Sequence, residues 1–310
     1  MSSNGKWTTA DVPDQSGRVA IVTGANTGLG YHTAAVLAQS GAHVVLAVRN
    51  LEKGNLALAR MVAAHPRADV TLQELDLSSL ESVRAAATAL RKTYPRIDLL
   101  INNAGVMWTP KQVTADGFEM QFGTNHLGHF ALTGLLLDNL LPVRGSRVVT
   151  VSSNGHRLRA AIHFDDLQWE HHYDRYAAHG QSKLANLLFT AELQRRLTEA
   201  GSPVLSMAAH PGYAATNLQF HSDSRLMEFA MGTLGNRLVA QDAASGARSS
   251  LYAATADLPG NTFAGPSGFG GTRGAPAPCA RSRAASDAEV ARHLWQVSES
   301  LTGVTASPEN

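Results

Sequence analysis

Short runs of apolar, β-branched residues alternate along this chain with longer stretches of helical period. This alternation is typical of parallel strands joined by crossover helices. Strands are expected at residues 19–23, 43–48, 70–74, 99–102, 147–151 and 204–209, with a weaker one near Thr262. The predicted fold class is therefore α/β, with a doubly wound parallel sheet of about seven strands and helices on both faces.

Apolar residues at helical spacing predict the crossover helices at 28–40, 52–64, 80–94, 117–141, 179–199 and 240–255. A tail over 265–286, rich in Gly, Ala, Pro and Arg, is expected to be irregular until Asp287 opens a short final helix. Two segments near 154–178 and 213–237 interrupt the rhythm. Both leave from carboxyl ends of strands, where open parallel sheets bind ligands, so both are predicted to be substrate loops.

The composition is that of an ordinary globular chain of 310 residues, with 44% hydrophobic residues and a formal net charge of +1. So small a charge offers no field for nucleic acid or an anionic membrane, which favours a small-molecule partner. The single cysteine, Cys279, cannot form an internal disulfide, so a reducing, cytoplasmic setting is expected. The apolar stretch 130–143 is interrupted by Asp138 and Asn139 and falls short of a membrane span. One domain over 18–310 is predicted behind a polar, loosely held arm, residues 1–17.

A glycine-rich turn joins the first predicted strand to the first helix, with the sequence Thr23-Gly24-Ala25-Asn26-Thr27-Gly28-Leu29-Gly30. Glycines allow the backbone to approach a pyrophosphate closely, and the helix N-terminus offers free N–H groups and a partial positive charge. Turn geometry alone could explain the glycines, but strand, turn and helix follow in the order that dinucleotide binding requires. The first third of the chain is therefore predicted to hold a nicotinamide dinucleotide.

The end of the second strand distinguishes between the two forms of that cofactor. An NAD site places a carboxylate there for the ribose hydroxyls, whereas an NADP site needs a cation. This chain has Val48-Arg49-Asn50 at the strand end, without an Asp or Glu. Arg49 could make a forked contact with a 2′-phosphate, although it could also be a solvated strand-end residue. NADP is predicted over NAD.

The spacing of the turn, TGxxxGxG, and the tetrapeptide Asn102-Asn103-Ala104-Gly105 resemble the classical short-chain dehydrogenases/reductases. The resemblance extends from Val19 to about Val304, and the segment Ser182-Lys183-Leu184-Ala185-Asn186 resembles the retinol dehydrogenase-like branch. It implies a Rossmann fold and hydride exchange between NADP and an alcohol or carbonyl. The cofactor contacts that it implies, together with those predicted from the turn and the strand end, are Gly24, Asn26, Thr27, Gly28, Leu29, Gly30, Arg49, Asp76, Leu77, Asn103, Ala104, Gly105, Lys183, Pro211, Gly212 and Thr216.

The resemblance also implies a catalytic set of Asn, Ser, Tyr and Lys, and three members have matching positions at Asn125, Ser153 and Lys183. The family carries a tyrosine four residues before the lysine, so that the two share a helix face and the ammonium lowers the phenol's pKa. In this chain the position is occupied by His179. Tyr176 could supply a displaced phenol, but it is expected in the preceding loop, too far for the chemistry.

A histidine at this position leaves two outcomes open. With a reference pKa of about 6.5 and Lys183 nearby, it should be neutral near pH 7, and its tip reaches about 2 Å less far than a phenol oxygen. One water could bridge that gap in acid–base work. Alternatively the proton donor is lost, with a fall in rate of about 10² to 10⁴.

Each residue of the set also has a plain structural interpretation. Ser153 could satisfy the turn after its strand, as Ser152 could instead, Asn125 could hold a helix bend, and Lys183 could be a surface lysine. Their occurrence together favours the catalytic interpretation. Aromatic and aliphatic residues of the second loop could line an apolar substrate pocket or simply pack: Tyr213, Phe220, Leu226, Met227 and Phe229. The histidines at 156, 163, 171 and 172 lack a metal-ligand spacing, so no metal is predicted, and a solvated or substrate-facing loop is expected there instead.

The predicted function is an NADP-dependent oxidoreductase for an apolar or lipid-like alcohol or carbonyl. A rival is an NADP-binding protein of the same fold with little or no catalysis, acting as a sensor or scaffold, for which His179 is the argument. A third interpretation is a histidine introduced to trap a complex, which the sequence does not distinguish from a natural one. A homodimer is expected from the pairing of the helices at 117–141 and 179–199 in the resembled family.

Overall fold

The computed structural model describes residues 6–212 and 243–308. In this part of the chain eight strands form one sheet in the order β3-β2-β1-β4-β5-β6-β7-β8. The first seven pair in parallel, and β8 runs antiparallel to β7 at the edge. The strands are β1 Val19–Thr23, β2 His43–Val48, β3 Asp69–Glu74, β4 Leu99–Asn102, β5 Arg147–Val151, β6 Leu205–Ala209, β7 Phe263–Pro266 and β8 Pro276–Pro278.

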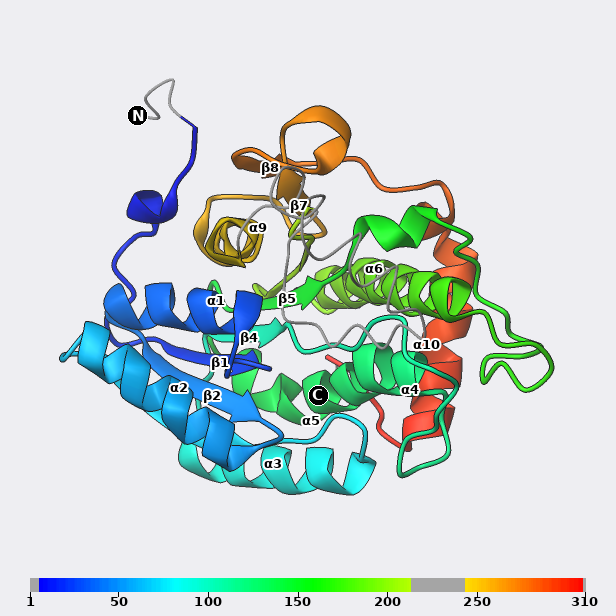
Figure 1. Ribbon diagram of the computed structural model, residues 1–310, viewed down its shortest axis with the longest axis horizontal. Coiled ribbons are helices and arrows are strands. Elements are labelled where there is room, and N and C mark those ends of the chain that lie inside the picture. Colours follow the sequence, from blue (N-terminus) through cyan, green and yellow to red (C-terminus); the bar gives the residue numbers. More distant parts are fainter. Residues whose placement is uncertain (1–5, 213–242, 309–310) are drawn as a thin grey trace, which may run out of the picture.

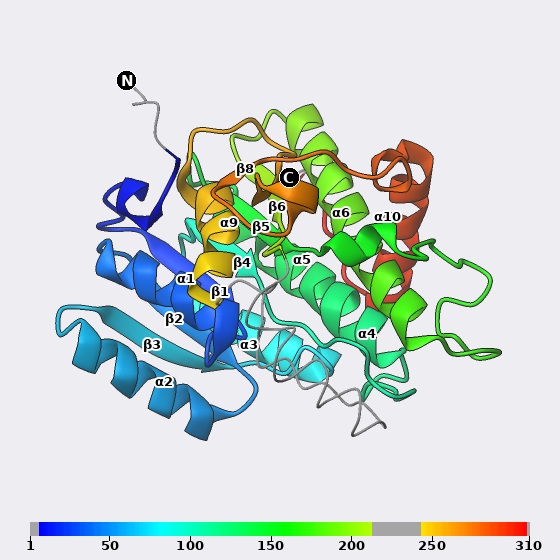
Figure 2. The ribbon, with the colours of Figure 1, turned by 45° about the horizontal axis from the view of Figure 1, so that its top comes forward.

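Helices cover both faces of the sheet, with α1 and α9 on one side and α3 and α5 on the other (Figure 1). The α-helices are α1 Gly28–Gln39, α2 Leu51–Ala64, α3 Leu80–Thr93, α4 Met120–Phe122, α5 Gly128–Leu140, α6 Arg175–Glu199, α9 Ala243–Thr255 and α10 Ala288–Thr302. Figure 2 shows α9 beside α1 and α10 beside α6, two contacts between segments distant in sequence. No described helix is long and apolar enough to cross a membrane.

The strands owe their burial on both faces to near-continuous apolar runs. In β1 the side chains of Ala20 and Val22 pack with α1 and α9, while Ile21 between them packs with α3 and α5. A side-chain period of two sends successive residues to opposite layers, so both layers require apolar residues. The predicted α/β sheet with helices on both faces is confirmed.

Several predicted boundaries are wrong for identifiable reasons. The helix predicted over 117–141 begins at Met120 and contains a π-helical stretch, Gly123–Leu127, that apolar periodicity does not reveal. Helix α6 begins at Arg175 rather than at residue 179, because Asp174 caps it by accepting hydrogen bonds from two backbone N–H groups. The tail over 265–286 is not wholly irregular, since Pro276–Pro278 forms β8, which tolerates proline as an edge strand.

The N-terminal arm is held more firmly than expected over its described part, residues 6–17. The indole of Trp7 meets Tyr252 of α9 edge-on, with ring centroids 5.4 Å apart. Gln15 is buried, and its N–H donates to the carbonyl of Ser40 at 2.8 Å. The arm therefore packs against α1 and α9 from Trp7 onward.

Candidate active site

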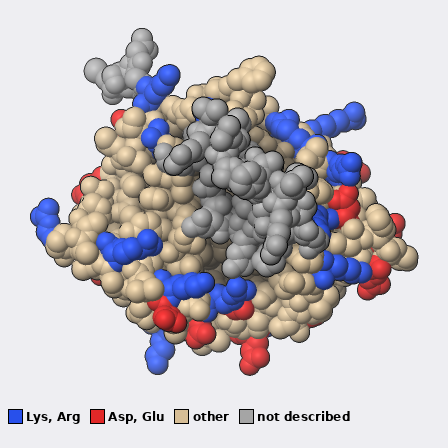
Figure 3. All heavy atoms as spheres, in the orientation of Figure 1, with Lys and Arg blue, Asp and Glu red and all other residues tan. Residues whose placement is uncertain are grey.

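The predicted site residues gather at the carboxyl ends of neighbouring strands. Strands β1, β4 and β5 are adjacent in the sheet, so the glycine-rich turn after β1, the segment 103–105 after β4 and Ser153 after β5 share one edge. Ligands of open parallel sheets bind at this edge. Charged side chains of both signs are interspersed around the molecular face in Figure 3, as the small net charge leads one to expect.

The glycine-rich turn packs tightly against the segment after β4. Gly24 has a φ of +65°, and a Cβ there would lie 2.9 Å from the Cα of Ala104. A Cβ at Gly30 would lie 2.5 Å from both Gly24 O and Asn103 Nδ2. Only glycine fits this conformation and these approaches, so the turn has the compact form that a pyrophosphate cradle requires.

The first turn of α1 keeps its N–H groups available at this edge. The helix begins at Gly28, and the side chain of its N-cap residue, Thr27, makes no capping hydrogen bond. The first N–H groups of a helix have no intrahelical partner, and they carry the positive end of the helix dipole. Gly28, Leu29 and Gly30 can therefore donate to a phosphate oxygen.

Two arginines lie near the predicted ribose end of the cradle. Arg49 is exposed directly after β2, and within the described residues it has no ion-pair or hydrogen-bond partner. Arg60 of α2 lies over the Tyr31 ring, 4.6 Å from its centroid, and its Nη2 is 3.5 Å from the carbonyl oxygen of Asn26. Sequence reasoning missed Arg60, because nothing in the helical pattern marks it as reaching the glycine-rich turn.

The remaining predicted cofactor contacts lie on neighbouring loops. The carboxylate of Asp76 is engaged locally, accepting from the N–H and hydroxyl of Ser78, while Leu77 is buried. Gly212 donates its N–H to Nδ1 of buried His210 at 3.2 Å, directly after Pro211. Thr216 and the second predicted substrate loop, including Tyr213, lie outside the described residues.

Asn125 lies in the π-helical stretch and is fully buried. Its amide makes a reciprocal pair with the backbone of Val106, accepting from the N–H at 2.8 Å and donating to the carbonyl at 3.0 Å. It also donates to the hydroxyl of Ser182 on α6 at 3.0 Å. These contacts match the structural interpretation of a buried amide at a helix bend, and they also join three segments of the site.

Lys183 is buried, which excludes the interpretation as a surface lysine. Its ammonium donates to the carbonyl of Val151 at 3.2 Å, and burial lowers its pKa to about 8. A Cβ placed on Gly105 would lie 3.5 Å from Lys183 Nζ and 3.0 Å from Asn125 Oδ1. The ammonium therefore lies beside Gly105, one of the predicted cofactor contacts.

Ser153 follows β5 and begins the short 3-10 turn Asn154–Arg157. Its hydroxyl oxygen accepts from the N–H of Gly155 at 3.0 Å, the local role that the structural interpretation assigns to it. Ser152 is buried and donates to the carbonyl of Lys183 at 2.8 Å, so its hydroxyl is fixed inside the fold. Of the two serines, Ser153 is the one whose hydroxyl shares its surroundings with His179.

His179 lies on α6, and its ring and the Ser153 hydroxyl both approach Gly155. A Cβ placed on Gly155 would be 3.4 Å from Ser153 Oγ and 3.5 Å from His179 Nε2. The ring is 5% exposed, and its Nδ1 is buried without a hydrogen-bond partner in the described part of the chain. Burial, and then the charge of Lys183, lower its pKa to about 3, so the imidazole is neutral at pH 7. The predicted neutral state is retained, although burial rather than Lys183 is its main cause.

The nearby tyrosines do not place a phenol at the position of His179. Tyr176 lies in the first turn of α6, not in the expected loop, and it is 42% exposed with its ring 5.1 Å from Trp108. The hydroxyl of Tyr173 is 3.0 Å from the carbonyl oxygen of Thr109, to which it donates, and it accepts from Gln121 at 2.9 Å. Both rings are committed elsewhere in this structure.

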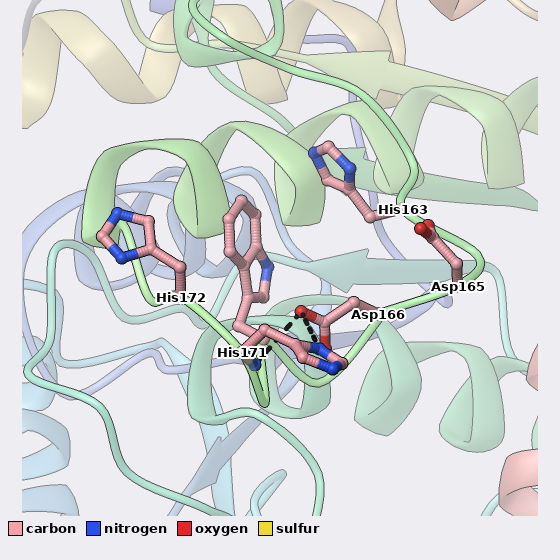
Figure 4. A pocket seen from close by; sticks show the side chains of 6 residues that line it. His163, Asp165, Asp166, His171 and His172 are labelled. Carbon is pink, nitrogen blue, oxygen red and sulfur yellow. Dashed lines mark hydrogen bonds and ion pairs between the residues drawn. The ribbon is translucent and has the colours of Figure 1, made fainter.

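A separate pocket of about 470 Å³ lies on the first predicted substrate loop (Figure 4). Nδ1 of His171 lies 3.3 Å from the Asp166 carboxylate at its wall, and His163 meets Trp169 edge-on. None of Asn125, Ser153, His179 and Lys183 lines it. Among the residues with described positions, no group of three His, Cys, Asp or Glu side chains could hold a metal ion.

Two buried histidines also contact this site: His129, which the sequence did not single out, and His156, which was expected in a solvated or substrate-facing loop but is 1% exposed. His129 joins Thr23 to Asn125, with its ring nitrogens 2.9 Å from Thr23 Oγ1 and 3.0 Å from the carbonyl oxygen of Asn125. His156 contacts the carbonyl of Ser153 at 2.6 Å and accepts from the N–H of Ser282 at 3.3 Å. Thr23 and Ser282 lie 106 and 126 residues from His129 and His156, so no local pattern could have indicated these bridges.

Known proteins resemble this chain over most of its length. The model of the short chain dehydrogenase family matches residues 18–226. Human retinol dehydrogenase 13 is 44% identical over 297 residues, covering 94% of this chain and 86% of that protein, and human retinol dehydrogenase 11 is 41% identical, covering 98% and 91%.

Solved structures share the fold. A crystal structure of an uncharacterized protein from Mycobacterium paratuberculosis is 47% identical, with a TM-score of 0.82 and coverage of 97% of this chain and 99% of that one. A short chain dehydrogenase from Shigella flexneri, solved with NADP, has a TM-score of 0.63 at 22% identity, covering 81% and 97%. The chain thus belongs to the short-chain dehydrogenase family of oxidoreductases and is similar over most of its length to the retinol dehydrogenases.

Proposed function

We propose that this protein is an NADP-dependent oxidoreductase that transfers a hydride between the nicotinamide and an apolar or lipid-like alcohol or carbonyl. The observation that carries the proposal is the buried ammonium of Lys183, which lies beside Gly105 and Asn125 at the edge of the sheet where the glycine-rich turn lies. Burying an ammonium is costly, and it is retained most readily where a ligand uses its charge.

The residues present fit the cofactor. Gly24 and Gly30 keep the turn compact, and α1 presents N–H groups without a capping side chain. Arg49 is exposed at the end of β2, where a 2′-phosphate would meet a forked guanidinium. The short chain dehydrogenase from Shigella flexneri, which shares this fold, was solved with NADP.

Each residue of the catalytic set has a role in this proposal. NADP, when bound, supplies or accepts the hydride. The Lys183 ammonium holds the nicotinamide ribose, the Ser153 hydroxyl donates to the substrate oxygen, and Asn125 helps to hold the active-site water. These roles follow the family resemblance position by position.

His179 takes the proton-transfer position. Its Nε2 lies beside the same Gly155 that Ser153 Oγ approaches, so both can face one substrate oxygen. A neutral imidazole donates one N–H, but with its pKa lowered to about 3 it is a weak base and is rarely protonated at pH 7. Because the ring is shorter than a phenol, one water would carry the proton. Turnover is therefore expected to be slow.

An apolar substrate is the finer part of this proposal. The relatives at 39–50% identity are named retinol dehydrogenases, and retinol is a lipid alcohol. Trp108 and Tyr176 form an aromatic pair beside the segment 105–106 and one turn before His179, where an apolar chain could pack. The homodimer and the cytoplasmic setting stay predictions.

The rival function is an NADP-binding sensor or scaffold without catalysis, favoured by the same histidine. The decisive experiment follows NADPH oxidation with a panel of aldehydes and ketones for the parent chain, His179→Tyr and the control His179→Phe. The proposal expects slow turnover in the parent and a turnover rate about 10²-fold or more higher in His179→Tyr. No such rise in rate is expected in His179→Phe. Tight NADPH binding without turnover in parent and His179→Tyr would support the rival.

A further inference from the structure

We infer that His129 is a positioning residue that ties the floor of the cofactor site to Asn125 and, through it, to the catalytic helix α6. His129 is 1% exposed on α5 and reaches no surface where a substrate could meet it. Both of its ring nitrogens nevertheless have partners, and each partner belongs to the candidate active site. The inference rests on the proposed function, since the residues it positions are those of that site.

The hydrogen bonds fix the tautomer of this ring. A carbonyl oxygen can only accept, so the contact with Asn125 O at 3.0 Å requires the proton on Nδ1. Nε2 is then the acceptor, and Thr23 Oγ1 at 2.9 Å must donate to it. Burial lowers the pKa of His129 to about 4, so this neutral form persists near pH 7.

The hydroxyl oxygen of Thr23 also holds the segment after β4 that forms the floor of the predicted cofactor site. This oxygen accepts from the N–H groups of Asn103 and Ala104, each at 2.9 Å. With its lone pairs occupied, the hydroxyl has only its proton to offer, and that proton faces two acceptors: His129 Nε2 at 2.9 Å and, at the longer distance of 3.3 Å, the carbonyl oxygen of Ile101. The shorter contact agrees with the tautomer set by Asn125. The side-chain amide of Asn103 further donates to the carbonyl of Thr23 at 2.8 Å.

The chain of hydrogen bonds continues beyond Asn125 to the catalytic helix. The Asn125 amide donates to Ser182 Oγ at 3.0 Å, and Ser182 donates to the carbonyl of His179 at 2.9 Å. A continuous path therefore runs from the end of β1 through His129 and Asn125 to the backbone of His179. Every link is buried, where a lost partner leaves an unsatisfied group at full cost.

Three variants separate positioning from simple packing. His129→Phe keeps a ring but removes both hydrogen bonds, and His129→Asn retains an N–H near the position of Nδ1. His126→Phe is the matched control. His126 is as buried as His129, but its ring contacts Ser298 Oγ on α10 at 2.9 Å instead of the cofactor site. Each is measured for thermal unfolding, NADPH affinity by fluorescence titration, and kcat and KM in the His179→Tyr background.

His129→Phe is expected to weaken NADPH binding about tenfold and, at saturating NADPH, to lower kcat about tenfold with the KM of the carbonyl substrate nearly unchanged. His129→Asn should recover part of the kcat, because the donor to Asn125 O returns. His126→Phe should lose comparable thermal stability and keep the NADPH affinity. Equal losses of affinity in His126→Phe and His129→Phe, or parental affinity in His129→Phe, would overturn the inference.

Two readouts keep this test distinct from that of the proposed function. The ¹⁵N shifts of the His129 ring, recorded on the whole protein without cofactor, report its tautomer, and a proton on Nε2 would overturn the bridge. If no variant turns over any compound, the proposed function fails, while the NADPH affinities still decide the role of His129.

Discussion

At the scale of single residues, Arg49 carries the choice between the two nicotinamide cofactors. It is exposed and unpaired within the described residues, so its guanidinium is available to a 2′-phosphate. Arg49→Ala should weaken NADPH binding by about 1.5–3 kcal/mol, the value of a charge-assisted contact, and leave NADH almost unaffected. Fluorescence titration with both cofactors measures this difference.

Arg60 offers a graded comparison in the same titration. Arg60→Gln removes the cation over Tyr31 and the contact to Asn26, which brace the turn without forming the strand-end fork. A smaller loss is expected for both cofactors alike. If the parent chain bound NADH as tightly as NADPH, Arg49 would have no role as a phosphate reader.

The buried charge of Lys183 should lower the stability of the folded protein. The pKa of Lys183 falls from 10.5 to about 8 in the folded chain. Below pH 8 the side chain is charged in both the folded and the unfolded state, and burying that charge lowers the stability of the folded state. Lys183→Met should therefore raise the free energy of unfolding at pH 7 by about 1–3 kcal/mol. The Val151 carbonyl keeps a donor in Asn186 at 3.1 Å.

The sign of the pH dependence follows from the same shift. Between pH 8 and 10.5 the unfolded chain binds the extra proton, so the parent gains stability as the pH rises through this window. The advantage of Lys183→Met should shrink there and vanish above pH 10.5. Urea unfolding at pH 7 and at pH 10 measures it, and a destabilised Lys183→Met at pH 7 would contradict the argument.

At this scale the sequence predicts which functional residues lie together when they are a fixed number of positions apart on one element. His179 and Lys183 are four residues apart on one helix, so their proximity follows from helical geometry alone. Arg60, His129 and His156 act across distances of 34, 106 and 126 residues, and only the folded chain brings them to their partners. Long-range contacts between polar residues leave no periodic signal.

At the scale of elements, α6 depends on its N-cap. The Asp174 carboxylate accepts from the N–H groups of Tyr176 and Ala177 at 2.8 and 3.2 Å. Asp174→Ala should lower the free energy of unfolding by about 1 kcal/mol and the Tm by about 2 °C. Thermal unfolding followed by circular dichroism measures the change.

Two comparisons separate the cap from the ion pair that Asp174 also makes. Asp174→Asn keeps an acceptor for the N–H groups and should remain close to the parent. Arg159→Gln breaks an ion pair whose arginine is 70% exposed, so little change is expected. A loss in Arg159→Gln as large as in Asp174→Ala would assign the effect to charge rather than to capping.

The pattern of apolar residues predicts some elements and their boundaries but not others. The strand 147–151 was predicted with its observed bounds, since a buried parallel strand is a continuous apolar run. The π-helical stretch Gly123–Leu127 was missed, because its residues are all buried and carry no periodicity. The early start of α6 was missed because a cap depends on Asp174 rather than on apolar spacing.

At the scale of the whole molecule, the last helix completes the site from the far end of the chain. Trp295 of α10 is 2% exposed, stacks on Phe189 of α6 at 5.7 Å and meets Phe130 of α5 edge-on at 5.0 Å. The guanidinium of Arg196 lies 4.5 Å from its centroid. Helix α6 carries His179 and Lys183, and His129 directly precedes Phe130 on α5, so α10 braces both helices of the site.

Trp295→Ala should therefore cost about 3–5 kcal/mol and weaken NADPH binding together with the fold. Trp295→Phe should cost much less than that, because the indole Nε1 is buried with no partner in the described chain and its removal relieves an unsatisfied donor. Urea unfolding followed in parallel by circular dichroism and by bound NADPH fluorescence tests the coupling, with coincident transitions expected. If NADPH stayed bound after the helical signal of Trp295→Ala had partly been lost, α10 would be an appendage, and the site would be held by the sheet and its nearer helices alone.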